Sequence, residues 1–151
     1  MGQQQLLLVI LVTIIVGIAT VVAINTFGTA ADQANVDAVT QDLASIAASA
    51  QGYYMRPEML GGGGRSFEGI SFNKFSFAGN VDSDTEGSNE NGVYTISNEG
   101  ENSFAILGVP EAASGSIAAR VCADEIVMGN YDPDDDNVTP PAETECESVE
   151  E

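Results

Sequence analysis

The chain begins with an uninterrupted apolar run, and this run restricts the possible folds more than any other feature. The nineteen residues from Leu6 to Ile24 contain two polar side chains, Thr13 and Thr20, and no charged one. As a helix rising about 1.5 Å per residue, the run is roughly 28 Å long, close to the hydrocarbon thickness of a bilayer. A helix that is apolar on every face needs lipid or other protein around it.

The same run supplies candidate residues for packing between helices of several copies of the chain. Small residues let two helices approach closely, and Gly17, with Thr13 and Thr20 nearby, provides them. The predicted packing set comprises Leu6, Leu7, Leu8, Ile10, Leu11, Ile14, Ile15, Gly17, Ile18, Val21 and Val22. A lone membrane anchor, without helix partners, is the alternative interpretation.

A cleavable signal peptide is a further alternative for the N-terminal run. Signal peptides carry basic residues before an apolar stretch of about 7–15 residues, and small residues at a cleavage site follow promptly. No Lys or Arg precedes Leu6, the run extends to Ile24, and no clear small-x-small site follows it promptly. The sequence therefore favours a helix that is retained.

The helical pattern continues beyond Ile24 as an amphipathic stripe. Apolar side chains recur at alternating intervals of three and four residues, at Val36, Val39, Leu43, Ile46, Ala50 and Tyr53. This spacing places them on one face of a helix. Thr26 and Gly28 lower helix propensity and mark a place for a bend. Pro57 disfavours helical geometry at Arg56, so we expect the helix to end near Met55.

Composition divides the chain into three parts. Residues 1–56 are predicted to form the helix, with the membrane span at 6–24, and residues 57–65 a flexible linker around Gly61–Gly64. Residues 66–151 are predicted to form a small antiparallel β domain. The predicted fold class is therefore α+β, with the amphipathic half of the helix covering one apolar face of the sheet.

Short alternating runs predict the strands of this domain. A first strand with a bulge or tight turn is expected at Ile70 to Phe77, where phenylalanines alternate with small or polar residues. Residues 93–97 and 103–109 flank a turn-rich loop and predict a hairpin. A further strand is expected at Ile117 to Val121.

Cys122 and Cys146 are the only cysteines of the chain, so one intrachain pairing is available. We predict that they form a disulfide, because the domain looks exported and its core is small. Two reduced thiols remain the alternative.

The segment between the cysteines contains the carboxylate spacing of a calcium loop. Its candidate Ca²⁺ ligands are Asp132, Asp134, Asp136, the Val138 carbonyl and Glu143. Asn137 stands where such loops have glycine, and two prolines follow it. A solvated acidic surface is therefore the second interpretation. Residues 137–139 also form an N-glycosylation sequon.

The charge excludes one class of partner and disfavours one class of activity. The chain has 23 acidic and 4 basic residues, a formal charge of −19, and no histidine. Nucleic-acid binding depends on clustered Lys and Arg, so we expect no nucleic-acid partner and anticipate cations around the protein instead. Without histidine or an evident apolar site with paired acids, an enzyme is not expected.

The combination of Leu6–Ile24, the amphipathic stripe up to Tyr53, and the Cys122–Cys146 segment resembles a type IV pilin or a related pilin-like filament subunit. The resemblance is architectural and covers most of the chain. It implies that apolar helices bundle at a filament axis and that β domains form the outer shell. The implied partners are further copies of the chain in a helical homopolymer, the inner membrane before assembly, and an assembly machinery.

The chain departs from that family at its start, where Gln3, Gln4 and Gln5 stand at the place of an acidic residue and a leader ending at Gly2 would be Met1 alone. Two functions are therefore expected as alternatives. The first is an extracellular filament subunit. The second is a single-pass, membrane-anchored binding domain at the cell surface that does not polymerise.

Overall fold

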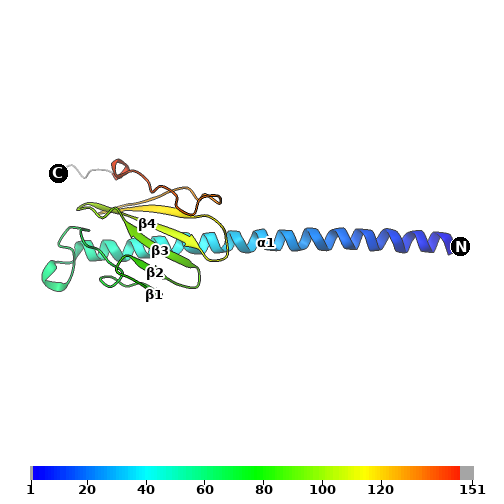
Figure 1. Ribbon diagram of the computed structural model, residues 1–151, viewed down its shortest axis with the longest axis horizontal. Helices are drawn as coiled ribbons and strands as arrows, with labels where there is room; N and C mark the ends of the chain where they lie inside the picture. The colour runs from blue at the N-terminus through cyan, green and yellow to red at the C-terminus, as the bar shows by residue number, and fades with distance from the viewer. Residues whose placement is uncertain (1, 147–151) are drawn as a thin grey trace. The chain divides into compact units, whose positions relative to one another are not determined.

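The structure is a computed structural model that describes residues 2–146, and it has an α+β fold (Figure 1). A single long helix, α1 (Gly2–Met55), packs on a six-stranded antiparallel sheet. The chain divides into two compact units, Met1–Ala34 and Asn35–Glu151. The first part of α1 belongs to the first unit, and the remainder, with the sheet, to the second.

The sheet is a meander in which each strand pairs with the next along the chain. The strands are β1 (Asn80–Val81), β2 (Glu86–Ser88), β3 (Gly92–Ser97), β4 (Ser103–Pro110), β5 (Ile117–Cys122) and β6 (Ile126–Met128). Two short 3₁₀ helices, η1 (Glu58–Leu60) and η2 (Glu143–Glu145), complete the regular elements of the described residues.

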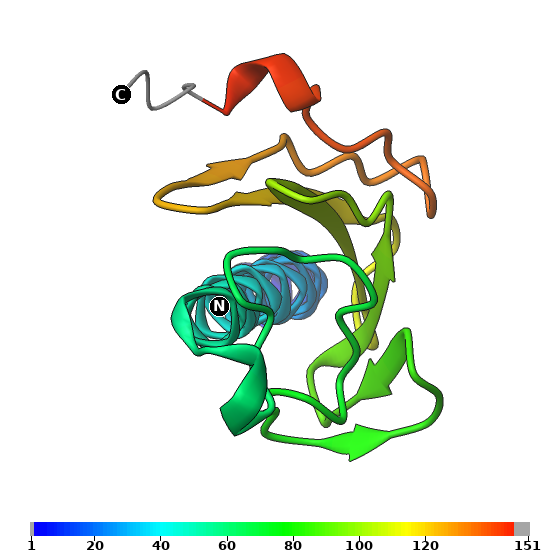
Figure 2. The ribbon, with the colours of Figure 1, turned by 90° about the vertical axis from the view of Figure 1, so that its left-hand side faces the viewer.

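The core of the second unit lies between the sheet and the second part of α1. Figure 2 looks along the helix and shows the sheet curving around it. Every residue of the predicted stripe is buried: Val36, Val39, Leu43, Ile46, Ala50 and Tyr53. Gly108 on β4 allows the close approach, because a Cβ there would lie 2.8 Å from Cγ1 of Val39. The amphipathic half therefore covers the sheet, as predicted.

Several predicted boundaries are confirmed. The helix ends at Met55, the hairpin is formed by β3 and β4, and the strand expected at residues 117–121 is β5. The sheet is larger than expected, because β1, β2 and β6 are too short to show an alternating pattern in the sequence.

The prediction of a strand from Ile70 to Phe77 is wrong, because this segment forms turns and bends. Its backbone bonds outside any ladder: the Phe72 amide donates to the Asp84 carbonyl and the Lys74 amide to the Ser71 carbonyl. The alternating phenylalanines form a cluster of rings instead. The ring centroid of Phe72 lies 5.4 Å from that of Phe75 and 4.9 Å from that of Phe77.

The glycine-rich segment after α1 was expected to be a flexible linker, and the structure shows a hydrogen-bonded cap instead. We call residues 56–65 the glycine cap. The Gly63 amide donates to the Tyr53 carbonyl, and the Arg65 amide to the Tyr54 carbonyl, each at 2.9 Å. These bonds use carbonyls in the last turn of α1, which would otherwise lack partners. The cap therefore terminates the helix.

The two parts of α1 predict opposite responses to the same substitution. Leu43→Ala removes a fully buried side chain and should lower the free energy of unfolding by about 2–5 kcal/mol. Leu7→Ala, at a position 67 % exposed, should leave it unchanged. Denaturant unfolding of the full chain in detergent measures both, and equal losses for the two variants would contradict this division of the helix.

Candidate functional site

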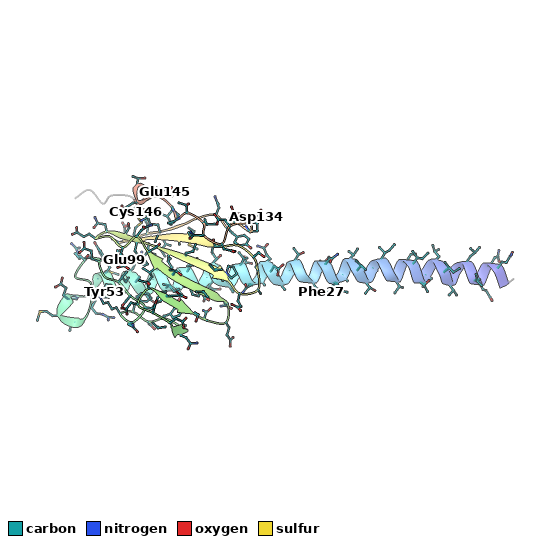
Figure 3. The ribbon with its side chains drawn as sticks, in the orientation of Figure 1. Phe27, Tyr53, Glu99, Asp134, Glu145 and Cys146 are labelled. Atoms are coloured by element: carbon teal, nitrogen blue, oxygen red, sulfur yellow. A yellow bond between two sulfur atoms is a disulfide. The ribbon has the colours of Figure 1, made fainter. Side chains whose placement is uncertain are left out.

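The candidate functional site is the apolar surface of the first unit. Every residue from Gly2 to Ala34 is exposed in the isolated chain. The exposed fractions of the large apolar side chains between Leu6 and Phe27 range from 46 % at Ile10 to 75 % at Phe27 (Figure 3). All eleven predicted packing residues belong to this surface. Because every side of the helix is apolar, no face of it suits water.

The threonine hydroxyls within this surface are hydrogen-bonded inside the helix. The hydroxyls of Thr13 and Thr20 donate to the carbonyls of Ile10 and Val16, each at 2.8 Å. Thr26 and Thr29 bond back to α1 in the same way. The first charged side chain of the sequence is Asp32. The segment from Leu6 to Ile24 therefore has no unpaired side-chain donor and no charged side chain that would disfavour apolar surroundings.

By length and composition, α1 contains a stretch that suffices to cross a membrane. A membrane anchor and a signal sequence both meet this criterion. Gly17 adds an observation of a different kind, because a Cβ built there meets nothing within 4 Å. The packing of the subunit itself therefore does not require a glycine at this position, which leaves the helix surface there open to a neighbouring helix.

A partly buried carboxylate, that of Asp42, joins the second part of α1 to the sheet. Oδ2 of Asp42 accepts hydrogen bonds from Nδ2 of Asn89 at 2.8 Å, from Nδ2 of Asn91 at 2.7 Å and from the Tyr94 hydroxyl at 2.7 Å. Asn35 adds a second link, since its Nδ2 donates to the Asn91 carbonyl. The sequence pattern alone gave no sign of this role for Asp42.

The Asp42 cluster changes the acidity of two of its members. Burial raises the pKa of Asp42, but the hydrogen bonds from Asn91, Tyr94 and Asn89 outweigh it and hold the pKa below its ordinary value. Burial, together with the neighbouring Asp42 carboxylate, raises the pKa of Tyr94. The pair therefore keeps a charged Asp42 and a neutral, donating Tyr94 at neutral pH.

The predicted disulfide is confirmed, with Cys122 bonded to Cys146. It closes a C-terminal segment that packs on the outer face of β5. Arg120 on β5 is buried beneath this segment, with Nε donating to the Pro141 carbonyl at 2.5 Å and Nη1 to the Ser103 hydroxyl at 3.2 Å. All six residues of β5 are consequently buried, although the helix covers only one face of the sheet.

The structure does not bring the predicted calcium ligands together. Asp132 accepts from the Asp134 amide and Asp136 from the Gly115 amide, whereas Glu143 accepts from the Ser103 hydroxyl on β4. The remaining predicted ligand, Val138, lies in the same segment and its amide donates to Ser116 Oγ. Across residues 2–146, no group of three or more Asp, Glu, Cys or His side chains is placed to hold a metal ion.

Comparisons with protein-family models, with curated proteins and with solved structures found no match to this chain. The functional interpretation therefore rests on the chain's own residues. Two features of the protein bear on its function: the exposed apolar surface of the helix and the acidic, disulfide-closed domain.

The Asp42 cluster predicts a specific pH dependence of stability. Because its pKa is lowered on folding, Asp42 stabilises the fold fully above the unfolded carboxyl pKa of 3.8, and this stabilisation is lost as pH falls through the lower folded value. Asp42→Asn should lower the free energy of unfolding at pH 7 by about 1–3 kcal/mol, and the deficit should shrink below about pH 4. Asp37→Asn, at an exposed position on α1, is the control and should change stability little. A deficit that stays constant from pH 7 to pH 2 would contradict the assignment.

Proposed function

We propose that this protein is the structural subunit of an extracellular, pilus-like filament. It polymerises through the apolar surface of Leu6 to Ile24 and exposes its acidic β domain at the filament surface. Before assembly, the same segment holds the subunit in the membrane as a single span. The observation that carries the proposal is a helix surface that is apolar on every side and that no other part of residues 2–146 covers.

The free energy of covering this surface decides between a free monomer and an assembled or membrane-bound state. Removing an aliphatic side chain from water stabilises by about 1.5–3 kcal/mol, so nineteen mostly aliphatic residues contribute some tens of kcal/mol before entropy losses. A free subunit in water is therefore strongly disfavoured. Since lipid and a helix bundle are similarly apolar, transfer from membrane to filament gains little, and extraction calls for an energy-consuming assembly machinery.

Two features favour a filament over a lone anchor. An anchor needs only apolar side chains, whereas Gly17 leaves a gap that suits a closely packed neighbouring helix. The charges are also segregated, because all 23 acidic residues lie from Asp32 onward. A helix bundle can thus form without burying a carboxylate, and the acidic domains remain in water. This arrangement is the one that the type IV pilin resemblance implies.

The second candidate is a single-pass, membrane-anchored binding domain at the cell surface, which the span alone would support. Negative-stain imaging of material sheared from cells separates the two. A filament subunit is recovered as filaments containing the chain, whereas an anchored monomer stays with the membrane fraction.

A charge within the apolar surface should prevent assembly. Ile15→Asp places a carboxylate in the helix bundle, where it has no partner, and should abolish filaments in sheared material. Ala31→Asp adds the same charge next to Asp32 and should leave filaments intact. Normal filaments from Ile15→Asp would contradict the proposal.

A second substitution separates assembly from membrane insertion. Gly17→Leu makes the span more apolar, so the subunit should still reach the membrane fraction. The added side chain blocks close helix approach and should lower the filament yield at least several-fold. Ile15→Leu conserves volume and is the matched control. If Gly17→Leu assembles like the wild type, the helix does not pack closely at this position.

A further inference from the structure

The glycine cap presents the densest group of exposed apolar side chains in the second unit. Met55 and Leu60 are each 71 % exposed and Met59 is 97 % exposed. The other large apolar side chains exposed in this unit, Val81 and Met128, are 41 % and 36 % exposed and lie on β1 and β6. The side chains of Met55, Met59 and Leu60 are thus mostly uncovered, while the backbone of this tip, residues 55–60, is hydrogen-bonded within the cap.

The conformation of this tip is set by the four consecutive glycines that follow it. Gly61 and Gly64 have φ of 76° and 59°, a region that side chains disfavour. A Cβ at Gly62 would lie 2.1 Å from the Arg56 carbonyl oxygen, and one at Gly63 would lie 2.0 Å from that of Ser66. A disordered loop would require none of these glycines. The glycines therefore give the apolar tip a defined conformation, although the described part of the subunit leaves its apolar side chains uncovered.

The charge around the tip differs from that of the rest of the protein. Of the four basic side chains, Arg120 is buried, and the other three, Arg56, Arg65 and Lys74, are exposed within residues 56–74. With Glu58 and Glu68, this segment has a formal charge of +1, which leaves −20 for the remaining residues. The exposed cations thus lie together on one segment of an acidic molecule.

The most concentrated acidic segment lies at the other end of the second unit. We call residues 132–136 the Asp loop, since four of its five residues are aspartates and all five are exposed. Figure 3 places Asp134 and Tyr53 at opposite ends of this unit, and Tyr53 is three residues before the cap. The bond between Ser116 and Asp132 holds the Asp loop against the start of β5. Cap and loop of one subunit therefore cannot meet each other.

We propose that the glycine cap of one subunit docks on the Asp loop of a second copy of the chain. The inference rests on the proposed function and names a contact between β domains within the filament. Met59 and Leu60 leave water at this contact, and Arg56 and Arg65 face the aspartates. Because the two surfaces differ and lie at opposite ends of the unit, the contact is head-to-tail and propagates as an open chain. It also opposes the repulsion between strongly acidic subunits.

A charge swap in the full chain tests this contact. The purified protein is assembled by removing detergent, and the critical concentration for filaments is measured by sedimentation. The critical concentration should rise roughly tenfold in each of two double variants, Arg56→Glu/Arg65→Glu and Asp134→Arg/Asp135→Arg. When all four changes are combined, it should return to within about twofold of the wild-type value. If only general repulsion between subunits mattered, Asp134→Arg/Asp135→Arg would lower the critical concentration, because these substitutions reduce the net negative charge.

The outcomes distinguish this inference from the proposed function. If the wild type forms no filaments, both fall. If the wild type assembles and Asp134→Arg/Asp135→Arg assembles equally well or better, or if the combination gives no recovery, the docking contact is wrong and the filament proposal stands.

The apolar part of the contact has its own variant. Met59→Ser/Leu60→Ser removes side chains that barely touch the subunit, so unfolding should be unchanged while the critical concentration rises at least several-fold. Met128→Ser, at an apolar position on β6 outside the cap, is the control and should assemble like the wild type. An unchanged critical concentration for the cap variant would overturn the docking contact.

Discussion

The need to exclude Leu6 to Ile24 from water is the constraint on which the rest of the structure depends. None of the residues from Gly2 to Ala34 is covered by other described parts of the chain, and the threonine hydroxyls of this segment already bond within the helix. In our proposal the cover comes first from lipid and then from identical helices of other copies. The remaining chain supplies what such a helix lacks, a folded and strongly hydrated domain that carries every charged side chain except Asp32.

In the second unit, the later part of the same helix is held by contacts within the subunit. Its apolar stripe packs on the sheet, and Asp42 gathers three donors from the opposite loop and strand, so helix and sheet are joined by both burial and charge-assisted hydrogen bonds. The disulfide and Arg120 secure a C-terminal cover on the other face of β5. A single helix thus serves two environments, and the change falls between Ala34 and Asn35.

Periodicity explains which parts of this architecture the sequence could predict. The stripe from Val36 to Tyr53 and the β3–β4 hairpin repeat over enough residues to be unambiguous, and two cysteines allow one pairing. The phenylalanines up to Phe77 alternate as a strand would, yet they form a ring cluster whose backbone bonds elsewhere. Asp42 was missed because a carboxylate on a helix usually faces solvent, and its donors are 47 to 52 residues away in sequence. The spacing typical of a calcium loop does not produce a metal-binding group among residues 2–146, and Glu143 accepts a hydrogen bond from Ser103.

The central claim is that copies of the apolar helix cover one another. Electron cryomicroscopy of filaments recovered from cells tests it most directly, since a helical reconstruction shows what surrounds each segment. The account predicts that density for Leu6 to Ile24 lies at the filament axis, in contact with the same segment of neighbouring copies on all sides, with the β domains outermost. Filaments held together by β domains alone, with this segment absent or facing solvent or lipid, would contradict it.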